Sequence, residues 1–113
     1  MLGQVYDISF SIDPSIIVIG EGWNMGTLPN SQKASQSNLD QMPGISVFND
    51  QIRDGVKGSV FSTTEPGWVT GMFSKSNSVK AGIVGNSNFG QGILNSFTTS
   101  DPGQSVNYVE AHD

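Results

Sequence analysis

The sequence predicts an α/β fold with about three parallel strands, connecting helices and long loops. Residues 16–19 (Ile-Ile-Val-Ile) form an apolar run without alternation, typical of a strand covered on both faces in a parallel sheet flanked by helices. Residues 45–48 form a second short strand that leads directly into a helical pattern. Residues 105–113 have strong strand propensity. The connections are long enough for right-handed crossovers, so we expect the three strand ends to share one rim.

The composition narrows the function classes. The 113 residues suffice for one domain or part of one. Five basic residues against ten acidic ones, with no basic cluster, argue against a nucleic-acid partner. The absence of cysteine excludes disulfides and thiolate zinc sites. No apolar run approaches the ~20 residues of a membrane helix, and the N-terminus lacks signal-peptide features. We therefore expect no nucleic acid, membrane, metal or cofactor.

The N-terminal residues predict a short amphipathic helix. Leu2, Val5, Tyr6 and Phe10 recur at spacings of three and four. Because a residue before proline disfavours helical geometry, this helix is expected to stop before Asp13-Pro14. The strand over residues 16–19 follows.

The middle of the chain predicts a long loop and a second helix. Residues 24–43 are mostly polar, and such a long connection favours a binding role, with one helical turn near residues 37–41. Residues 51–58 predict a helix capped by Asn49 or Asp50 and stopped at Gly58. Residues 59–104 contain two Gly- and Ser-rich stretches that are not periodic enough to assign.

The strand ends carry the candidate functional groups. Glu21 follows the first strand between two glycines, and Trp23 adds a flat apolar face, which together suit a sugar site. A carboxylate that merely caps a turn is the alternative. Asn49 and Asp50 follow the second strand, and His112 with Asp113 ends the third. Carboxylates on separate strands suit glycoside hydrolysis, where one protonates the leaving oxygen and others stabilise the positively charged sugar.

Other sites fit less well. Gly20-x-Gly22-x-x-x-Gly26 superficially matches a dinucleotide motif, but Glu21 would repel a pyrophosphate and Pro29 interrupts the required helix. With one histidine in the chain, only carboxylates remain to complete a metal shell. A serine-nucleophile elbow, Gly-x-Ser-x-Gly, is also missing.

Three blocks together resemble bacterial type I pullulanases, debranching members of the α-amylase family of glycoside hydrolases. They are residues 13–23 (DPSIIVIGEGW), 42–58 (MPGISVFNDQIRDGVKG) and 106–113 (VNYVEAHD), in the family's order. The resemblance implies a partial (β/α)8 TIM-type barrel, with these strands as the fifth, sixth and seventh of eight. Residues 1–113 would then be one fragment of the catalytic barrel.

The resemblance also implies roles for individual residues. Glu21 would be the general acid/base, and Asp113 the carboxylate that stabilises the transition state. His112 would hydrogen-bond the sugar beside the scissile bond, and Trp23 would line the adjoining subsite. The substrate would be a branched α-glucan cleaved at α-1,6 linkages with retention of configuration.

The nucleophilic aspartate of the family belongs to the fourth strand, and nothing in residues 1–7 matches that strand's motif. The chain alone is therefore expected to be inactive, and its unpaired strand edges predict self-association. A non-catalytic carbohydrate-binding module that stacks sugars on Trp23 and Trp68 is the alternative function. Its weakness is that the predicted helices do not suit a mostly β module.

Overall fold

The computed structural model describes residues 2–87 and 96–112. Its sheet contains β1 (Val18–Gly20), β2 (Ile45–Asn49) and β3 (Ser105–Asn107) in the order β1-β2-β3. Both pairings are parallel, with Val18 opposite Ile45 and Val47 opposite Ser105. The predicted α/β arrangement of three parallel strands is confirmed.

Among the described residues, three α-helices and five short 3-10 helices accompany the sheet. The α-helices are α1 (Leu2–Ile12), α2 (Asp50–Lys57) and α3 (Ser76–Ile83), and the 3-10 helices are η1 (Asn30–Gln32), η2 (Gln36–Gln41), η3 (Trp68–Thr70), η4 (Phe73–Lys75) and η5 (Pro102–Gln104). Helix α1 ends before Asp13-Pro14, as predicted. There the Asp13 carboxylate accepts bonds from the Ser15 amide and hydroxyl, which lower the pKa of Asp13.

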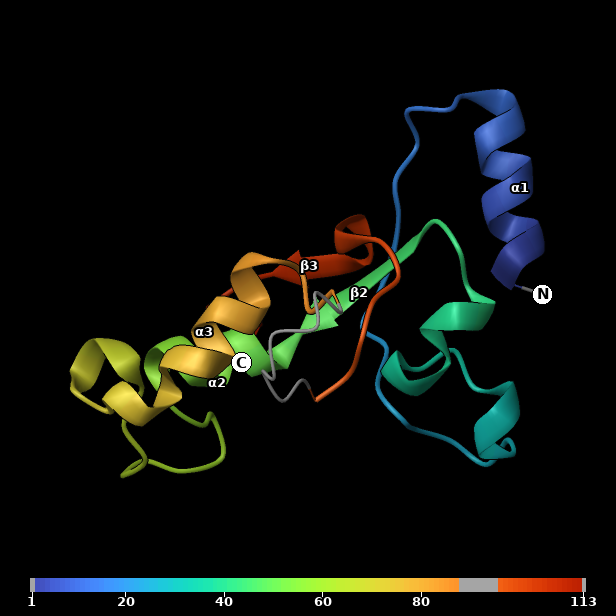
Figure 1. Ribbon diagram of the computed structural model, residues 1–113. Coiled ribbons are helices and arrows are strands. Elements are labelled where there is room, and N and C mark those ends of the chain that lie inside the picture. The colour runs from blue at the N-terminus through green and yellow to red at the C-terminus, as the bar shows by residue number, and fades with distance from the viewer. Residues whose placement is uncertain (1, 88–95, 113) are drawn as a thin grey trace.

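The sheet lies between two groups of elements (Figure 1). Helices α2 and α3 pack together at one end with η3 and η4, while α1 and residues 24–43 lie toward the other end. The described chain measures 46 × 31 × 24 Å. The core consists of Leu39, Met42, Ile45, Val47 and Phe97, with Tyr6 and Val18 packed against it.

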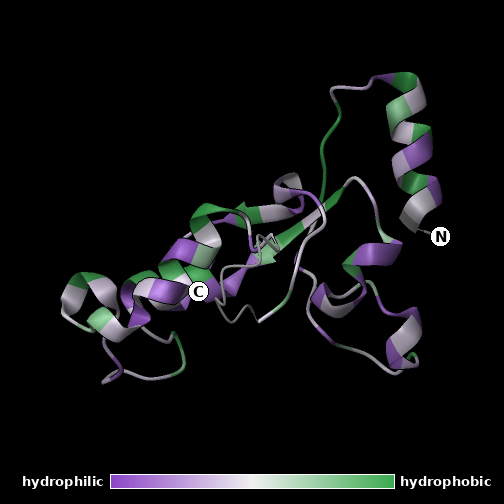
Figure 2. Cartoon of the chain, viewed as in Figure 1, coloured by the Kyte–Doolittle hydropathy of each residue, from purple (hydrophilic) through white to green (hydrophobic). Residues whose placement is uncertain are grey.

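The first strand differs from its prediction in position and burial. It begins at Val18 rather than residue 16, and Ile17 and Ile19 are 75% and 53% exposed. Within the described residues β1 pairs only with β2, so it is an edge strand whose outer side has no neighbour. The apolar stretch before β1 and much of α1 are hydrophobic in Figure 2. The apolar residues 16–19 are of the kind that is buried on both faces of a sheet, but no described element covers the side chains of Ile17 and Ile19.

The third strand is shorter than predicted. It ends at Asn107, and residues 108–112 continue outside the sheet. Two side chains of this segment bind α2: the Tyr108 hydroxyl accepts a bond from Arg53, and Glu110 accepts one from Lys57. The segment that leads to His112 thus contacts α2 beyond the end of the strand ladder.

Helix α2 begins at a buried asparagine. The Asn49 side chain is fully buried and its Oδ1 accepts a bond from the Ile52 amide, which caps the helix. Its Nδ2 donates to Asn86 Oδ1 at 2.9 Å and to Ser105 Oγ at 3.0 Å. One amide therefore joins β2, α2, β3 and the end of α3. Helix α2 stops at Gly58, as predicted.

Helix α3 was not assigned from the sequence, because small residues obscure its periodicity. It packs closely on α2: a Cβ on Gly55 would lie 2.9 Å from Ser78 Cβ, and one on Gly82 would overlap Ile52. The helix ends where the amides of Gly85 and Asn86 bond back to Gly82 and Ala81. This Schellman pattern uses the left-handed backbone of Gly85.

No helix among the described residues is long and apolar enough to cross a bilayer.

Replacing Asn49 with alanine should destabilise the chain by about 2 to 4 kcal/mol, because it removes the α2 cap and leaves buried polar groups unpaired. Urea unfolding followed by circular dichroism measures this loss. The control is Asn77→Ala, at an exposed α3 position, which should change stability by less than ~0.5 kcal/mol. Equal losses in the two variants would contradict the role assigned to Asn49.

Candidate functional site

Two of the predicted site residues meet at the carboxyl ends of the strands. Glu21 comes directly after β1, and His112 lies five residues beyond the end of β3. Although 91 positions separate them, His112 Nε2 lies 3.1 Å from Glu21 Oε1, within hydrogen-bond distance. Their side chains are 79% and 48% exposed, respectively, so both groups are open to an incoming molecule.

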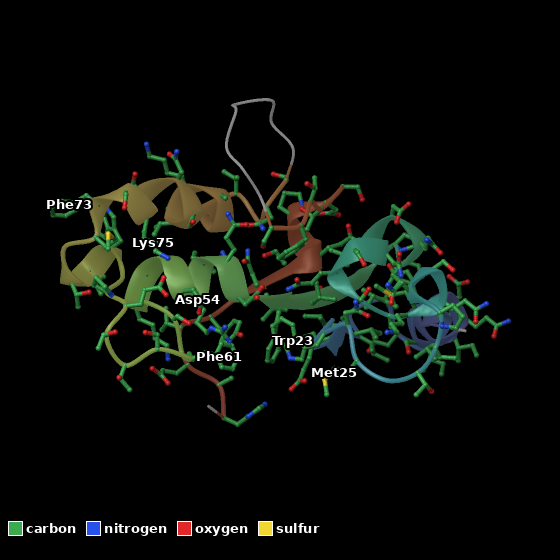
Figure 3. The ribbon with its side chains drawn as sticks, turned by 90° about the horizontal axis from the view of Figure 1, so that it is seen from below. Trp23, Met25, Asp54, Phe61, Phe73 and Lys75 are labelled. Atoms are coloured by element: carbon green, nitrogen blue, oxygen red, sulfur yellow. The ribbon has the colours of Figure 1, made fainter. Side chains whose placement is uncertain are left out.

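Trp23 borders several hollows among the described residues at this rim. The first is a crevice of about 20 Å³ that it shares with Glu21, Phe48, Tyr108, Ala111 and His112. The second, of about 200 Å³, is lined by Trp23, Asp50, Arg53 and Phe61. The third, of about 510 Å³, is lined by Leu39 and polar residues of the loop over residues 24–43, together with Ser96, Phe97 and Thr98. Figure 3 shows Trp23, Met25 and Phe61 along one side of the molecule.

Two further aromatic rings, those of Phe48 and then Tyr108, pack in sequence beside the indole ring of Trp23. The Trp23 ring meets Phe48 edge-on, with ring centroids 6.4 Å apart, and Phe48 contacts Tyr108 at 4.9 Å. Edge-on and tilted aromatic contacts of this kind are favourable because a ring's positive edge meets a negative face. The Trp23 ring is thus supported by Phe48 on one side, and it still lines the hollows described above.

Gly22 and Gln36 set the direction of the chain between Glu21 and Trp23. Gly22 has φ +77°, and a Cβ there would lie 2.8 Å from Val47 Cβ, so only glycine fits without strain. The Gly22 carbonyl accepts a bond from the Gln36 amide at 2.8 Å. The Gln36 side chain in turn donates to the Phe48 carbonyl and to Asp50 Oδ1. Gly20, in contrast, has open space around it.

Arg53 lies beneath the rim and is 4% exposed. Burial by itself lowers the pKa of this guanidinium, but its hydrogen bond and charge interaction with Asp54, with smaller contributions from Tyr108 and Asp50, outweigh burial and raise it. Arg53 is therefore a permanent buried cation. Its Nη1 donates to the Tyr108 hydroxyl at 2.9 Å, and its Cζ lies 5.6 Å from the Tyr108 ring centroid.

Not every predicted rim residue reaches the rim. The Asn49 side chain is directed into the interior, where it caps α2. Asp50 begins α2, accepts a bond from Gln36 and lines the second hollow. Asp113 lies outside the described residues.

Sequence reasoning missed the residues that support the site: Phe48, Tyr108, Arg53, Gln36 and Phe61. Tyr108 and Phe48 lie in predicted strands, and the strand pattern does not indicate that their side chains pack together beside Trp23. Gln36 lies in a polar loop among similar residues. In the described part of the chain, no group of three or more His, Asp or Glu side chains is arranged to hold a metal ion.

The fold and the rim place the chain among α/β sheets that carry functional groups at the carboxyl ends of parallel strands. No protein-family model matches it. The chain is 44% identical over 101 residues to a pullulanase of Bacillus subtilis (strain 168), a match that covers 88% of this chain and 14% of that protein. It is 25% identical over 117 residues to pullulanase A of Streptococcus pneumoniae, covering 97% of this chain and 8% of that protein.

Solved pullulanase structures are similar as well. Pullulanase from Paenibacillus barengoltzii, in complex with maltohexaose and α-cyclodextrin, superposes with a TM-score of 0.92 at 40% identity, over 99% of this chain and 17% of that one. Type I pullulanase from Bacillus subtilis, complexed with maltose, gives a TM-score of 0.83 at 37% identity, over 97% and 15%. The chain is therefore similar, over nearly all its length, to one segment of pullulanases, and spans 8 to 17% of these relatives.

Replacing Gly22 with alanine should destabilise the chain by about 1 to 3 kcal/mol, because the left-handed backbone and the overlap with Val47 are both unfavourable. Urea unfolding gives the stability change, and the NMR signals of the His112 ring report on the neighbouring site. Gly20→Ala, on the other side of Glu21, is the matched control and should alter neither. Equal tolerance of both changes would show that Gly22 does not set the chain direction.

Proposed function

We propose that this chain is a segment of the catalytic domain of a pullulanase-type glycoside hydrolase. The reaction is hydrolysis of α-1,6-glucosidic branch linkages in pullulan, starch or glycogen-derived glucans, with retention of configuration. The observation that carries the proposal is the contact between Glu21 and His112 at the strand ends of a chain 44% identical to a pullulanase.

In this proposal the sheet is part of an eight-stranded α/β barrel, with β1, β2 and β3 as its fifth, sixth and seventh strands. The parallel pairing of all three strands in chain order supports it. The exposed apolar side chains of Ile17, before β1, and Ile19, within it, support it too, since further elements of a barrel would cover them. A complete barrel needs ~250 residues, so the segment supplies less than half of one.

Glu21 acts as the general acid/base in the proposed mechanism. It first donates a proton to the glycosidic oxygen, which lets the bond to the leaving group break, and later accepts a proton from the attacking water. His112 hydrogen-bonds the sugar beside the scissile bond, and Trp23 packs against the adjoining sugar. Asp113 is assigned the stabilising carboxylate, by family resemblance alone.

Retention requires a nucleophile ~5 to 5.5 Å from the acid/base. Glu21 is the one carboxylate among the described residues that line its crevice. The proposed nucleophile would come from a neighbouring strand of the complete barrel, so the isolated chain is proposed to be inactive.

A branched α-glucan is the proposed substrate of the complete enzyme. Similar pullulanases were solved with maltotriose, maltotetraose, and maltohexaose with α-cyclodextrin. The alternative, a binding module that uses Trp23 and Trp68 together, is not favoured. Trp68 packs against Phe73, with ring centroids 6.3 Å apart, and Figure 3 shows Phe73 at the far end of the helical part, away from Trp23.

The test of the catalytic proposal is a chimera in which this chain replaces the matching segment of Bacillus subtilis pullulanase. The chimera should release reducing sugar from pullulan, and Glu21→Gln should lower its kcat by ~10²- to 10⁴-fold, because the variant cannot transfer a proton. The isolated chain should release none.

Glu65→Gln provides the matched control, because Glu65 pairs with Lys75 in the helical part of the chain, away from the crevice. It should leave the kcat of the chimera unchanged. A folded chimera without activity would contradict the proposed function. So would an active chimera that keeps full activity after Glu21→Gln.

The isolated chain is further proposed to self-associate. Val5, Ile8 and Ile12 are exposed and lie on one face of α1, since they recur at spacings of three and four. Tyr6, on another face, packs against the core, so α1 has apolar side chains facing two ways. The open edge of β1 adds unpaired backbone groups that favour pairing with another chain.

Light scattering should show dimers or larger species of the isolated chain. Ile8→Lys with Ile12→Lys should shift the population toward monomer, because charged side chains oppose burial of this face. Ile83→Lys, at an exposed position of α3, is the control and should leave the distribution unchanged. A monodisperse monomer of the unsubstituted chain would rule out self-association.

A further inference from the structure

Two basic side chains of α2 reach the segment that leads to His112. Arg53 and Lys57 are four residues apart, so they lie on one face of the helix. Arg53 Nη1 donates to the Tyr108 hydroxyl at 2.9 Å, and Lys57 Nζ donates to Glu110 Oε1 at 2.8 Å. One helix face thus contacts the segment at two points, four and two residues before His112.

Beyond the strand, the described contacts of this segment are made by side chains. Beyond β3, none of the backbone hydrogen bonds found between described residues outside helices and strands involves residues 108–112. The Tyr108 ring packs on Phe48, the same ring that supports Trp23. Side-chain contacts of Tyr108 and Glu110 therefore contribute to where His112 lies.

The two contacts differ in strength. Arg53 is almost fully buried, and a buried cation that loses its hydrogen-bond partners is strongly unfavourable. Loss of its contact with Asp54 or Tyr108 should therefore cost considerable stability. Lys57 and Glu110 are 26% and 68% exposed, so solvent screens that pair and it contributes less. We expect the Arg53 contact to dominate.

We propose that Arg53, assisted by Lys57, is a positioning residue that holds residues 108–112 against α2 and thereby keeps His112 within hydrogen-bond distance of Glu21. The proposal rests on the proposed function, in which these two side chains face the same sugar. Arg53 acts through Tyr108 and lines the neighbouring hollow, and it is not among the described residues that line the crevice between Glu21 and His112.

His112 offers a direct readout, because it is the one histidine in the chain. Its ring C–H signals in NMR should move when Glu21→Gln removes the neighbouring carboxylate at fixed pH. The experiment compares this response in the unsubstituted full chain and in Tyr108→Phe with Glu110→Gln. These changes remove one hydroxyl and one charge, and leave the aromatic packing in place.

The response to Glu21→Gln should fall at least ~2-fold in the Tyr108→Phe and Glu110→Gln background, since coupling between two groups disappears when their contact is lost. Glu65→Gln is the matched control, because it breaks the 2.6 Å ion pair with Lys75 and touches no part of the segment. It should leave the response unchanged. A full response in the folded double variant would overturn the proposal.

If Tyr108→Phe prevents folding, Arg53→Lys tests the dominant contact, because it keeps the positive charge but shortens the reach to the Tyr108 hydroxyl. An undiminished response in that folded variant would overturn the proposal. Lys57→Ala and Glu110→Gln lie at partly exposed positions and should each reduce the response by a smaller amount, and an undiminished response in both would overturn the assistance assigned to Lys57. In the active chimera, Tyr108→Phe should lower kcat without affecting far-UV circular dichroism. An inactive chimera would contradict the proposed function only, since the NMR response of the isolated chain tests the positioning role separately.

Discussion

The buried amide of Asn49 is the interaction on which the arrangement of the chain depends. It stands at the end of β2, where the chain passes from strand to helix, and is fully buried. Its oxygen satisfies an amide of the first turn of α2, while its nitrogen bonds side chains of Asn86 and Ser105. Because a buried polar group must find partners, the ends of β2 and α3 and the start of β3 are fixed relative to one another. The hydrogen bonds of Asn49 thus help to set the relative positions of the strand ends that form the rim.

The polar network continues from Asn86 toward the site. Asn86 adopts a left-handed backbone, and its side chain donates to Gln51 and to the Phe97 carbonyl. Gln51 also accepts a bond from the Ser96 amide, and Ser96 and Phe97 line the hollow of about 510 Å³ beside Trp23. The junction that organises the fold therefore also positions one wall of that hollow. A substitution at Gln51 would act on this hollow through Ser96, since the Gln51 side chain bonds both Asn86 and the Ser96 amide.

Local patterns predicted those elements whose signals are local. A cap at Asn49 or Asp50 and a stop at Gly58 predicted α2, and Pro14 predicted the end of α1, because capping and proline geometry act over a few residues. Helix α3 was not predicted because its buried residues are the small Ala81 and Gly82. Such residues give a weak periodic signal in the sequence, and they stabilise the helix by allowing close contact with α2. The burial of Asn49 and the path of residues 108–112 depend on partners dozens of positions away. The pairing of Glu21 with His112 was expected only in general terms, as strand ends sharing a rim.

The contact between Glu21 and His112 also limits how the proposed acid/base can work. A carboxyl group that is to give its proton to a glycosidic oxygen must direct that proton toward the substrate, yet in this structure Glu21 Oε1 faces an imidazole nitrogen at 3.1 Å. A sugar entering between them would exchange this contact for hydrogen bonds from His112 to a hydroxyl and from Glu21 to the leaving oxygen. The exchange conserves hydrogen bonds, so it need not oppose binding. The two side chains must move apart to admit the sugar while the backbone that carries them stays in place, and for that reason the proposed anchoring of residues 108–112 on α2 contributes to the site together with the carboxylate.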